Sequence, residues 1–257
     1  MSDIIARRFA ELASARRKAL VVYVTAGHPD VERSLALLQG LAASGADVIE
    51  VGVPFSDPLA DGPIIQGSSQ QALEHGMNLE RTLSLISRAA VGVPVVLFSY
   101  LNPIMAAGRG VLARAADAGA HGILVTDLPV GADPEREAWL GSGPLEFVRL
   151  VAPTTPSDRM AEIAKHGSGF VYLISRRGVT GVQRDVAADL PETLARLRAV
   201  TGLPICVGFG ISNAEQAADA ARFADGVAVG SAVVRAAEES VEAALALVRS
   251  MRTRLDA

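Results

Sequence analysis

The sequence predicts an α/β fold, a single (β/α)8 TIM barrel over residues 1–257 with an extra N-terminal helix. Eight short runs rich in Val, Ile and Leu are each followed by turn residues and then by a stretch with helical spacing. Most of these runs are apolar on both faces, as strands of a covered parallel sheet are. The length of the chain suits eight such units. A doubly wound open sheet is the alternative that this alternation leaves open.

The elements follow one another regularly along the chain. An amphipathic, Arg-rich segment near residues 3–18 precedes the first strand and is expected to cover the bottom of the barrel. The expected strands, in order, are LVVYVTAG, DVIEVGVP, PVVLFSY, GILVTDLP, EFVRLVAP, GFVYLIS, PICVGFG and DGVAVGS. Most of these runs end in Gly or Pro, which favour turns. Helical stretches such as VERSLALLQGLAASG and AEQAADAARF lie between them.

Two connections are longer than a barrel turn needs. Residues 54–77 carry little periodicity, and residues 176–189 read RRGVTGVQRDVAAD. Most βα loops have about 2 to 6 residues, and structureless loops above about 12 are usually functional or disordered. Both connections follow strands, so we expect both at the C-terminal face, where barrel active sites are built.

Composition excludes several classes of function. The net charge is −4 with acids and bases interspersed, which gives no support for nucleic-acid binding. No apolar run reaches the roughly 18 residues of a membrane span, and the N-terminus does not read as a signal peptide, so a cytoplasmic protein is expected. Cys206 is the only cysteine, so there is neither a disulfide framework nor a thiol metal site.

A glutamate interrupts the apolar second strand. Alternation places Val48 and Glu50 on one face, so if Val48 points into the barrel, Glu50 does too, near the top. Burial of an unpartnered carboxylate costs several kcal/mol or raises its pKa. A raised pKa suits a group that gives and takes a proton near pH 7. A structural Glu paired with an Arg or with backbone N–H groups is the alternative.

Two aspartates follow in the next connection. Asp57 lies in SDP and Asp61 in ADGP, and Asp before Pro or Gly is ordinary turn chemistry. We favour this structural interpretation for Asp57. The role of Asp61 stays open, because its loop begins directly after the strand of Glu50 and could fold back over the same cavity.

Glycines follow three consecutive strands. GVTG contains Thr180 and Gly181, VGFGIS contains Gly210, and VGSAVV contains Gly230 and Ser231. Barrel enzymes often hold a phosphate after the seventh and eighth strands, on backbone N–H groups and a helix N-terminus. One such cluster alone also fits a tight turn. Three neighbouring clusters favour phosphate binding.

The two lysines and two of the four histidines are placed away from the predicted cavity. Lys18 and Lys165 precede strands and lie toward the bottom, so no Schiff-base lysine is available at the top. His121 and His166 also precede strands, and the two remaining histidines, interpreted as polar loop residues, are too few for a three-His zinc site. What remains is carboxylate acid–base catalysis on a phosphorylated substrate, without metal or covalent intermediate.

Six segments together resemble the tryptophan synthase alpha chain family, namely YVTAGHP, IEVGVPFSDPLADGPIIQ, LVAPTTP, SRRGVTG, VGFGIS and VGSAVV. They are spread in order over most of the chain. The resemblance implies a (β/α)8 barrel that cleaves indole-3-glycerol phosphate to indole and glyceraldehyde 3-phosphate. It implies no cofactor in this chain, and a beta-chain partner that uses pyridoxal phosphate in an α2β2 complex with a tunnel for indole.

The resemblance also implies catalytic roles. Cleavage of the C3–C3′ bond needs an electron sink, which the indole ring supplies as its indolenine tautomer once C3 is protonated. Glu50 would protonate C3 and take the proton of the C3′ hydroxyl. Asp61 would accept or stabilise the ring N–H proton, and Tyr172 would line the site.

The other implied site residues form three groups. Substrate contacts are expected at Tyr23, Phe98, Tyr100, Thr180 and Phe209. Phosphate contacts are expected at Gly181, Gly210, Gly230 and Ser231. Contacts with the beta chain are expected at Pro54, Asp57 and Asn102. Thr180 is the loop residue expected to touch Asp61 on closure.

Two positions depart from the family pattern. Arg177 stands before GVTG where a small residue is more usual, and Ile64 replaces a more frequent Thr or Val. Three other functions are weighed against the main one. They are another phosphate-binding barrel enzyme, a stand-alone indole-releasing lyase, and a non-catalytic barrel that activates a beta-type partner. PFSDPLADGP argues against the first, and the presence of Glu50 and Asp61 argues against the last.

Overall fold

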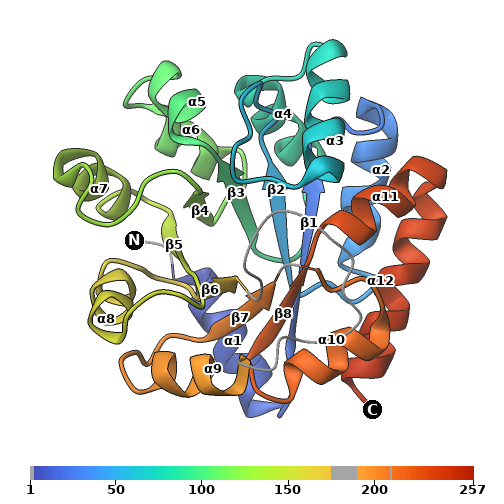
Figure 1. The fold of residues 1–257 in the computed structure, drawn as a ribbon. Helices are drawn as coiled ribbons and strands as arrows, with labels where there is room; N and C mark the ends of the chain where they lie inside the picture. Colours follow the sequence, from blue (N-terminus) through green and yellow to red (C-terminus); the bar gives the residue numbers. More distant parts are fainter. Residues whose placement is uncertain (1–2, 175–189, 209) are drawn as a thin grey trace.

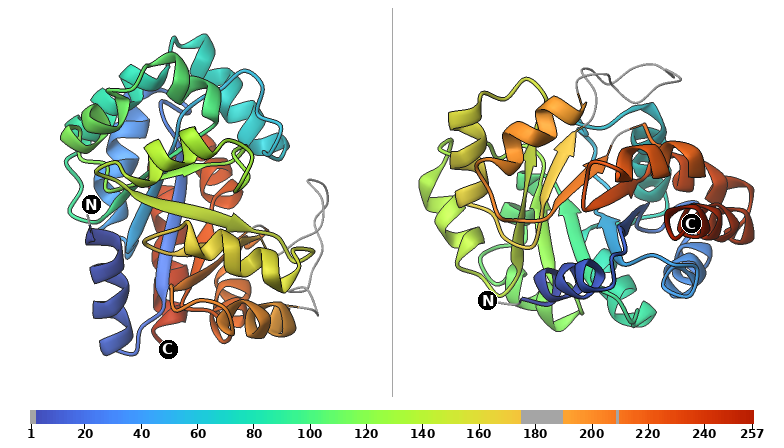
Figure 2. Two further views of the ribbon diagram at one scale, coloured as in Figure 1. Left: turned by 90° about the vertical axis from the view of Figure 1, so that its left-hand side faces the viewer. Right: turned by 90° about the horizontal axis from the view of Figure 1, so that it is seen from below.

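The computed structural model is a closed barrel of eight strands with helices around it (Figures 1 and 2). The structure describes residues 3–174, 190–208 and 210–257. The strands are β1 (Ala19–Thr25), β2 (Val48–Gly52), β3 (Val95–Ser99), β4 (Gly122–Val125), β5 (Glu146–Val151), β6 (Val171–Ile174), β7 (Ile205–Gly208) and β8 (Gly226–Val229). Each predicted run coincides with one of them, except that β1 begins one residue before its run, at Ala19.

The described helices alternate with these strands. They are α1 (Ile4–Ser14), α2 (Val31–Leu41), α3 (Pro63–Glu74), α4 (Leu79–Ala89), α5 (Leu101–Ala106), α6 (Val111–Asp117), α7 (Pro134–Gly141), α8 (Ser157–Lys165), α9 (Leu190–Arg198), α10 (Ala214–Ala221), α11 (Ser231–Glu239) and α12 (Val241–Leu255). Each strand pairs in parallel with its neighbours in chain order, and β8 closes against β1. The closed order confirms the predicted barrel, and the open doubly wound sheet is wrong.

The strands carry two apolar layers because their side chains alternate between the two faces. Inward-facing residues such as Val48, Val96, Leu124 and Val148 form the barrel core. The opposite faces pack against the surrounding helices in a larger apolar cluster. This accounts for strands that are apolar on both faces, as the sequence predicts.

Helix α1 covers the end of the barrel at which the strands begin. Its buried side chains Ile5, Phe9 and Leu12 join the inner core. The rings of Phe9 and Phe170 lie 5.4 Å apart between centroids. Glu146, at the start of β5, accepts hydrogen bonds from the backbone N–H of Ile5 at 2.7 Å and of Ala6 at 3.1 Å. The predicted closure of the bottom is therefore confirmed, and the mouth lies at the opposite end.

The expectation of a long irregular connection over residues 54–77 is wrong, because α3 occupies much of it. Gly62 precedes the helix, and Pro63 begins it, where a missing N–H costs nothing. The buried side chains of α3 are Ile65, Ser68, Ser69 and Ala72. Their spacing is helical, yet two of them are small and polar, so the sequence shows no hydrophobic period. The irregular part after β2 is limited to residues 53–62.

Polar side chains at the bottom face accept hydrogen bonds from strand N–H groups. Asp47 accepts from Leu20 at 2.9 Å, and Asp225 accepts from Ile205 at 2.8 Å. His121 accepts from the N–H of Val95 through Nδ1 at 3.1 Å. The position of His121 far from the mouth, predicted from the sequence, is confirmed.

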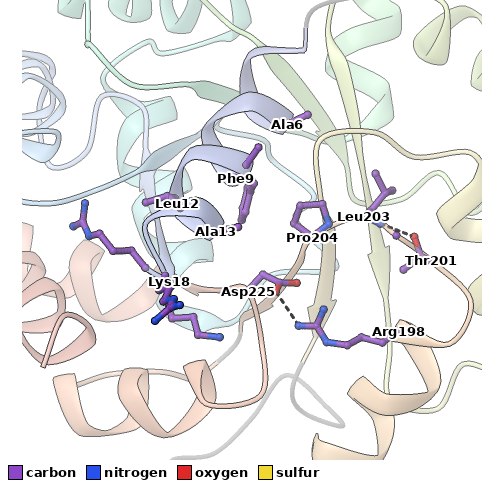
Figure 3. A pocket seen from close by; sticks show the side chains of 14 residues that line it. Ala6, Phe9, Leu12, Ala13, Lys18, Arg198, Thr201, Leu203, Pro204 and Asp225 are labelled. Carbon is purple, nitrogen blue, oxygen red and sulfur yellow. Dashed lines mark hydrogen bonds and ion pairs between the residues drawn. The ribbon is translucent and has the colours of Figure 1, made fainter.

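A cavity of about 550 Å³ also lies at the bottom, between α1 and the segment that leads into β7 (Figure 3). Three of the four basic side chains that line it have partners, among them Arg17, which contacts Asp256 at 3.1 Å. Arg198 contacts Asp225 at 2.9 Å, and Lys18 donates to the carbonyl of Ala224 at 2.7 Å. This cavity is at the opposite end of the strands from the mouth, and its partnered charges favour a structural role.

Candidate active site

Glu50 lies inside the barrel, in register with Tyr23 of β1 and Val96 of β3. Its side chain is 1% exposed, and Oε1 has no hydrogen-bond partner. Burial raises the pKa of this carboxyl to about 8. Within the described part of the chain, neither an Arg nor a backbone N–H hydrogen-bonds it, so the structural alternative for Glu50 finds no support. The carboxyl is mostly protonated at neutral pH and can therefore give a proton.

Two aromatic rings cover Glu50 on the side of the mouth. Tyr23 and Phe98 meet edge to face, with 5.2 Å between ring centroids. Gly52 lies two residues beyond Glu50 on the same face of β2, and a Cβ there would stand 2.1 Å from the Tyr23 hydroxyl. Phe98 is in register with Gly52 on β3. The aromatic pair therefore crosses β2 just above Glu50 and keeps water from it.

Tyr172 lies on β6 and belongs to the inner core of the barrel. A Cβ at Gly208 of β7 would stand 2.0 Å from the Tyr172 hydroxyl, so only glycine leaves room for the ring. Burial raises the pKa of Tyr172, and the charges of Glu50 and Asp61 raise it further. Burial also raises the pKa of Tyr23, and the charges of Asp61 and Glu50 raise it further. Both phenols therefore lie within electrostatic reach of both carboxyl groups.

Asp61 lies in the loop between β2 and α3, and the tyrosine that follows β3 holds it. The Tyr100 hydroxyl donates to Asp61 Oδ2 at 2.8 Å and accepts from the N–H of Ala60 at 2.9 Å. Gln66 donates to the Asp61 carbonyl at 2.8 Å. Burial raises the pKa of Asp61 to about 6, and the hydrogen bond from Tyr100 opposes this shift. At neutral pH Asp61 is therefore mostly ionised.

The predicted phosphate residues lie at the ends of two neighbouring strands. Gly230 precedes α11, and Ser231 is its exposed first residue, so the first N–H groups of this helix have no helical partner. Gly210 follows β7 and has φ +84°, a conformation that glycine adopts most easily. A Cβ on Gly230 would lie 3.3 Å from Cβ of Tyr23, which places the start of α11 beside Tyr23.

Several predicted residues lie outside the described residues. They are Thr180, Gly181, Phe209 and Arg177, the last of which departs from the family pattern. Their expected contacts with the substrate, the phosphate and Asp61 stay predictions. The other departing position, Ile64, is partly buried in α3 and packs against the cluster of Tyr23.

The predicted partner contacts differ in exposure. Asp57 and Asn102 are exposed, whereas Pro54 is buried at the start of the loop. Two large apolar side chains are exposed on the same two segments, Leu59 at 89% and Met105 at 37%. The loop after β2 and the start of α5 thus present a surface with both polar and apolar groups.

Some features of the site were not predicted from the sequence. Thr25 and Ser68 join β1 to α3 through a hydroxyl contact of 2.7 Å. Thr25 lies two residues after Tyr23 in the same strand, so the alternation of side chains already indicated that it faces inward. His28, interpreted as a polar loop residue, is instead 3% exposed and lies 3.7 Å from Glu238. Burial lowers the pKa of His28, so its ring is neutral near pH 7.

In the described ranges, no group of three or more His, Cys, Asp or Glu side chains is arranged to hold a metal ion. None of the helices described is both long and apolar enough to cross a membrane.

Comparisons with known proteins decide the family. The family model of the tryptophan synthase alpha chain matches residues 9–255. The chain belongs to this family. A tryptophan synthase alpha chain of Desulfatibacillum aliphaticivorans is 46% identical over 241 residues, which cover 93% of this chain and 91% of that one. A tryptophan synthase alpha chain of Gluconacetobacter diazotrophicus is 48% identical over 248 residues, which cover 93% and 89%.

Solved structures related to the tryptophan synthase alpha chain family have the same fold. A chain of Mycobacterium tuberculosis tryptophan synthase matches with a TM-score of 0.92 at 35% identity, covering 99% of both chains. The alpha subunit of Legionella pneumophila matches with a TM-score of 0.87 at 35% identity, covering 100% of this chain and 99% of that one. Members of this family are lyases of tryptophan biosynthesis that cleave indole-3-glycerol phosphate. The resemblance found in the sequence is confirmed. The alternative that the chain is another kind of phosphate-binding barrel enzyme is wrong.

Proposed function

We propose that Glu50 and Asp61 form the acid–base pair that cleaves indole-3-glycerol phosphate. One observation carries the proposal, namely that the two carboxyl groups have different surroundings, since Glu50 is buried with an unpartnered oxygen and Asp61 accepts a hydrogen bond from Tyr100. With a pKa of about 8, Glu50 holds its proton at pH 7, whereas Asp61, with a pKa of about 6, has lost its own. A general acid and a general base are therefore both ready before the substrate binds.

The proton transfers balance over one turnover. Glu50 gives its proton to indole C3 while Asp61 takes the proton of the ring nitrogen, which produces the indolenine tautomer. Glu50, now ionised, removes the proton of the C3′ hydroxyl. The C3–C3′ bond then breaks, its electron pair returns to the ring, and the nitrogen regains its proton from Asp61. Indole and glyceraldehyde 3-phosphate leave with both carboxyl groups restored.

The other residues of the cavity would hold the substrate in position for these transfers. Tyr23, Phe98 and Tyr172 offer aromatic walls around Glu50 for the indole ring. Backbone N–H groups at Gly210, Gly230 and Ser231 suit the phosphate. In this proposal Gly181 adds to the phosphate site, Phe209 adds to the indole pocket, and Thr180 contacts Asp61. Tyr100 positions Asp61 through its hydroxyl group.

We also propose a beta-chain partner that docks on the loop after β2 and on α5. The proposal is supported by four exposed side chains on these segments, Asp57, Leu59, Asn102 and Met105. Pro54 is buried at the start of the loop and would stabilise it. Tyr100 immediately precedes α5 and hydrogen-bonds Asp61. A partner bound to α5 would therefore fix the position of Tyr100 and, through it, of Asp61. The proposed assembly is an α2β2 complex in which the beta chain carries pyridoxal phosphate and receives indole. A single barrel domain in the cytoplasm fits this role.

The test is an indole-release assay on indole-3-glycerol phosphate with increasing beta chain. We expect slow release by the isolated chain and an increase of about 10-fold to 100-fold on saturation, because an error of about 1 Å in a catalytic group can cost about 10²-fold. A flat titration with full activity would favour a stand-alone lyase. No release under any condition, together with activation of the beta chain, would favour a non-catalytic barrel.

A further inference from the structure

The Tyr23 hydroxyl has no part in the proton transfers, although its ring forms part of the cavity wall. The residue is 8% exposed and in register with Glu50. Their strands, β1 and β2, are neighbours in the barrel (Figure 1). Its hydroxyl stands over Gly52, 2.1 Å from where a Cβ would be, and its Cβ lies beside Gly230. Tyr23 therefore extends from the proposed phosphate site to the place where the bond is cleaved.

A chain of hydroxyl groups lies behind Tyr23. Ser68 Oγ donates to the carbonyl of Ile65 at 2.9 Å, and Thr25 Oγ1 lies 2.7 Å from Ser68 Oγ. Either hydroxyl of the Thr25–Ser68 pair can be the donor, and Thr25 is the donor in its long contact with Tyr23, so neither contact uses the Tyr23 proton. Thr25 Oγ1 is 3.5 Å from the Tyr23 hydroxyl, the outer limit of a hydrogen bond. The Tyr23 proton thus has no good acceptor in the part of the chain that the structure describes.

A buried hydroxyl without a good partner is unfavourable, whereas a phenylalanine ring would fill the same space without that cost. The charges of Asp61 and Glu50 both raise the pKa of Tyr23, so its hydroxyl lies within electrostatic reach of both carboxyl groups. A donor in this position needs an acceptor that a ligand brings. The proposed substrate has hydroxyl oxygens on the three-carbon chain between its phosphate and its indole ring.

We propose that the Tyr23 hydroxyl donates a hydrogen bond to a hydroxyl oxygen of the glycerol chain and so selects a hydroxylated chain over a plain alkyl chain. This inference rests on the proposed function. The phosphate at Gly230 and the cleaved bond at Glu50 fix the two ends of that chain, and Tyr23 lies along the path between them. A site that hydrogen-bonds a substrate hydroxyl discriminates against analogues that lack it.

The test compares the wild type with Tyr23→Phe, each saturated with beta chain. We expect kcat/KM for indole-3-glycerol phosphate to fall about 10-fold, the effect of one buried hydrogen bond. The inhibition constant of indole-3-propanol phosphate, which has the same indole and phosphate ends but no hydroxyl, should change by less than about 2-fold. A purely structural role of Tyr23 would weaken the two ligands alike.

Thr25→Val is the matched control, because it removes a hydroxyl of the same chain one step away from the cavity. It should lower the melting temperature without a selective loss for the hydroxylated substrate. An unchanged kcat/KM in Tyr23→Phe, an equal loss for the propanol analogue, or the same selective loss in Thr25→Val would each overturn the inference. A wild type that fails to cleave indole-3-glycerol phosphate would contradict the proposed function itself.

Discussion

Replacing Glu50 by Gln should change how the stability of the barrel depends on pH. The pKa of Glu50 is about 8 in the fold, whereas an unburied glutamate has 4.5. Between these values the folded state holds a proton that the unfolded chain has released, so stability falls as pH rises. Each unit of pKa difference is worth about 1.4 kcal/mol, so the full effect above pH 8 is about 5 kcal/mol. Glu50→Gln has the same shape and lacks this titration.

The measurement is urea unfolding of the isolated chain, followed by circular dichroism at several pH values. From pH 5 to pH 9, the wild type should lose about 4 kcal/mol of unfolding free energy relative to Glu50→Gln. Other titrating groups, including Asp61, are present in both proteins and cancel in the comparison. Parallel pH profiles would show that Glu50 is not held in a water-poor environment, and the reasoning from its burial would then be refuted.

Three further predictions concern the rest of the site. Tyr100→Phe removes the hydrogen bond that lowers the pKa of Asp61, so that pKa should rise further above about 6, and the acidic limb of the pH–rate profile should move to higher pH. Ser231→Ala should weaken binding of indole-3-propanol phosphate only modestly, whereas Gly210→Val should block it, because φ at Gly210 is +84°. Calorimetric titration checks both, and equal effects would count against a backbone phosphate site. Asp57→Ala should lose most of the activation by the beta chain and keep the basal rate of indole release, and an unchanged titration would remove Asp57 from the partner surface.

The strands were predictable because both of their faces are buried, which leaves a strong apolar signal in the sequence. Helix α3 was not predictable in this way, because Ser68 and Ser69 lie on its buried face. Ser68 is buried for a specific reason, its contact with Thr25 of β1 at 2.7 Å. Because Ser68 is buried through a contact with a distant residue, α3 lacks the apolar period by which a helix is recognised in a single sequence.

The sequence predicted both carboxyl groups as site residues, but it did not indicate what holds Asp61 in place. Glu50 was visible because a charge inside an apolar strand is unusual. The hydrogen bond between Tyr100 and Asp61 joins residues far apart in the chain and follows from no local pattern. The glycines at 52 and 208 each leave room for a tyrosine hydroxyl of the neighbouring strand, which no local pattern indicates. Such close approaches depend on the strand register, which only the assembled barrel fixes.

The most direct test of the acid–base pair is the pH dependence of kcat/KM for indole-3-glycerol phosphate with saturating beta chain. This ratio reports the groups of the free enzyme. Because Glu50 must be protonated and Asp61 ionised, activity should be highest near pH 7 and should fall above a pKa of about 8. The substrate phosphate titrates near pH 6, so the basic limb is the decisive one. A kcat/KM that stays constant or rises from pH 7 to pH 9.5 would contradict the assignment of Glu50 as the acid.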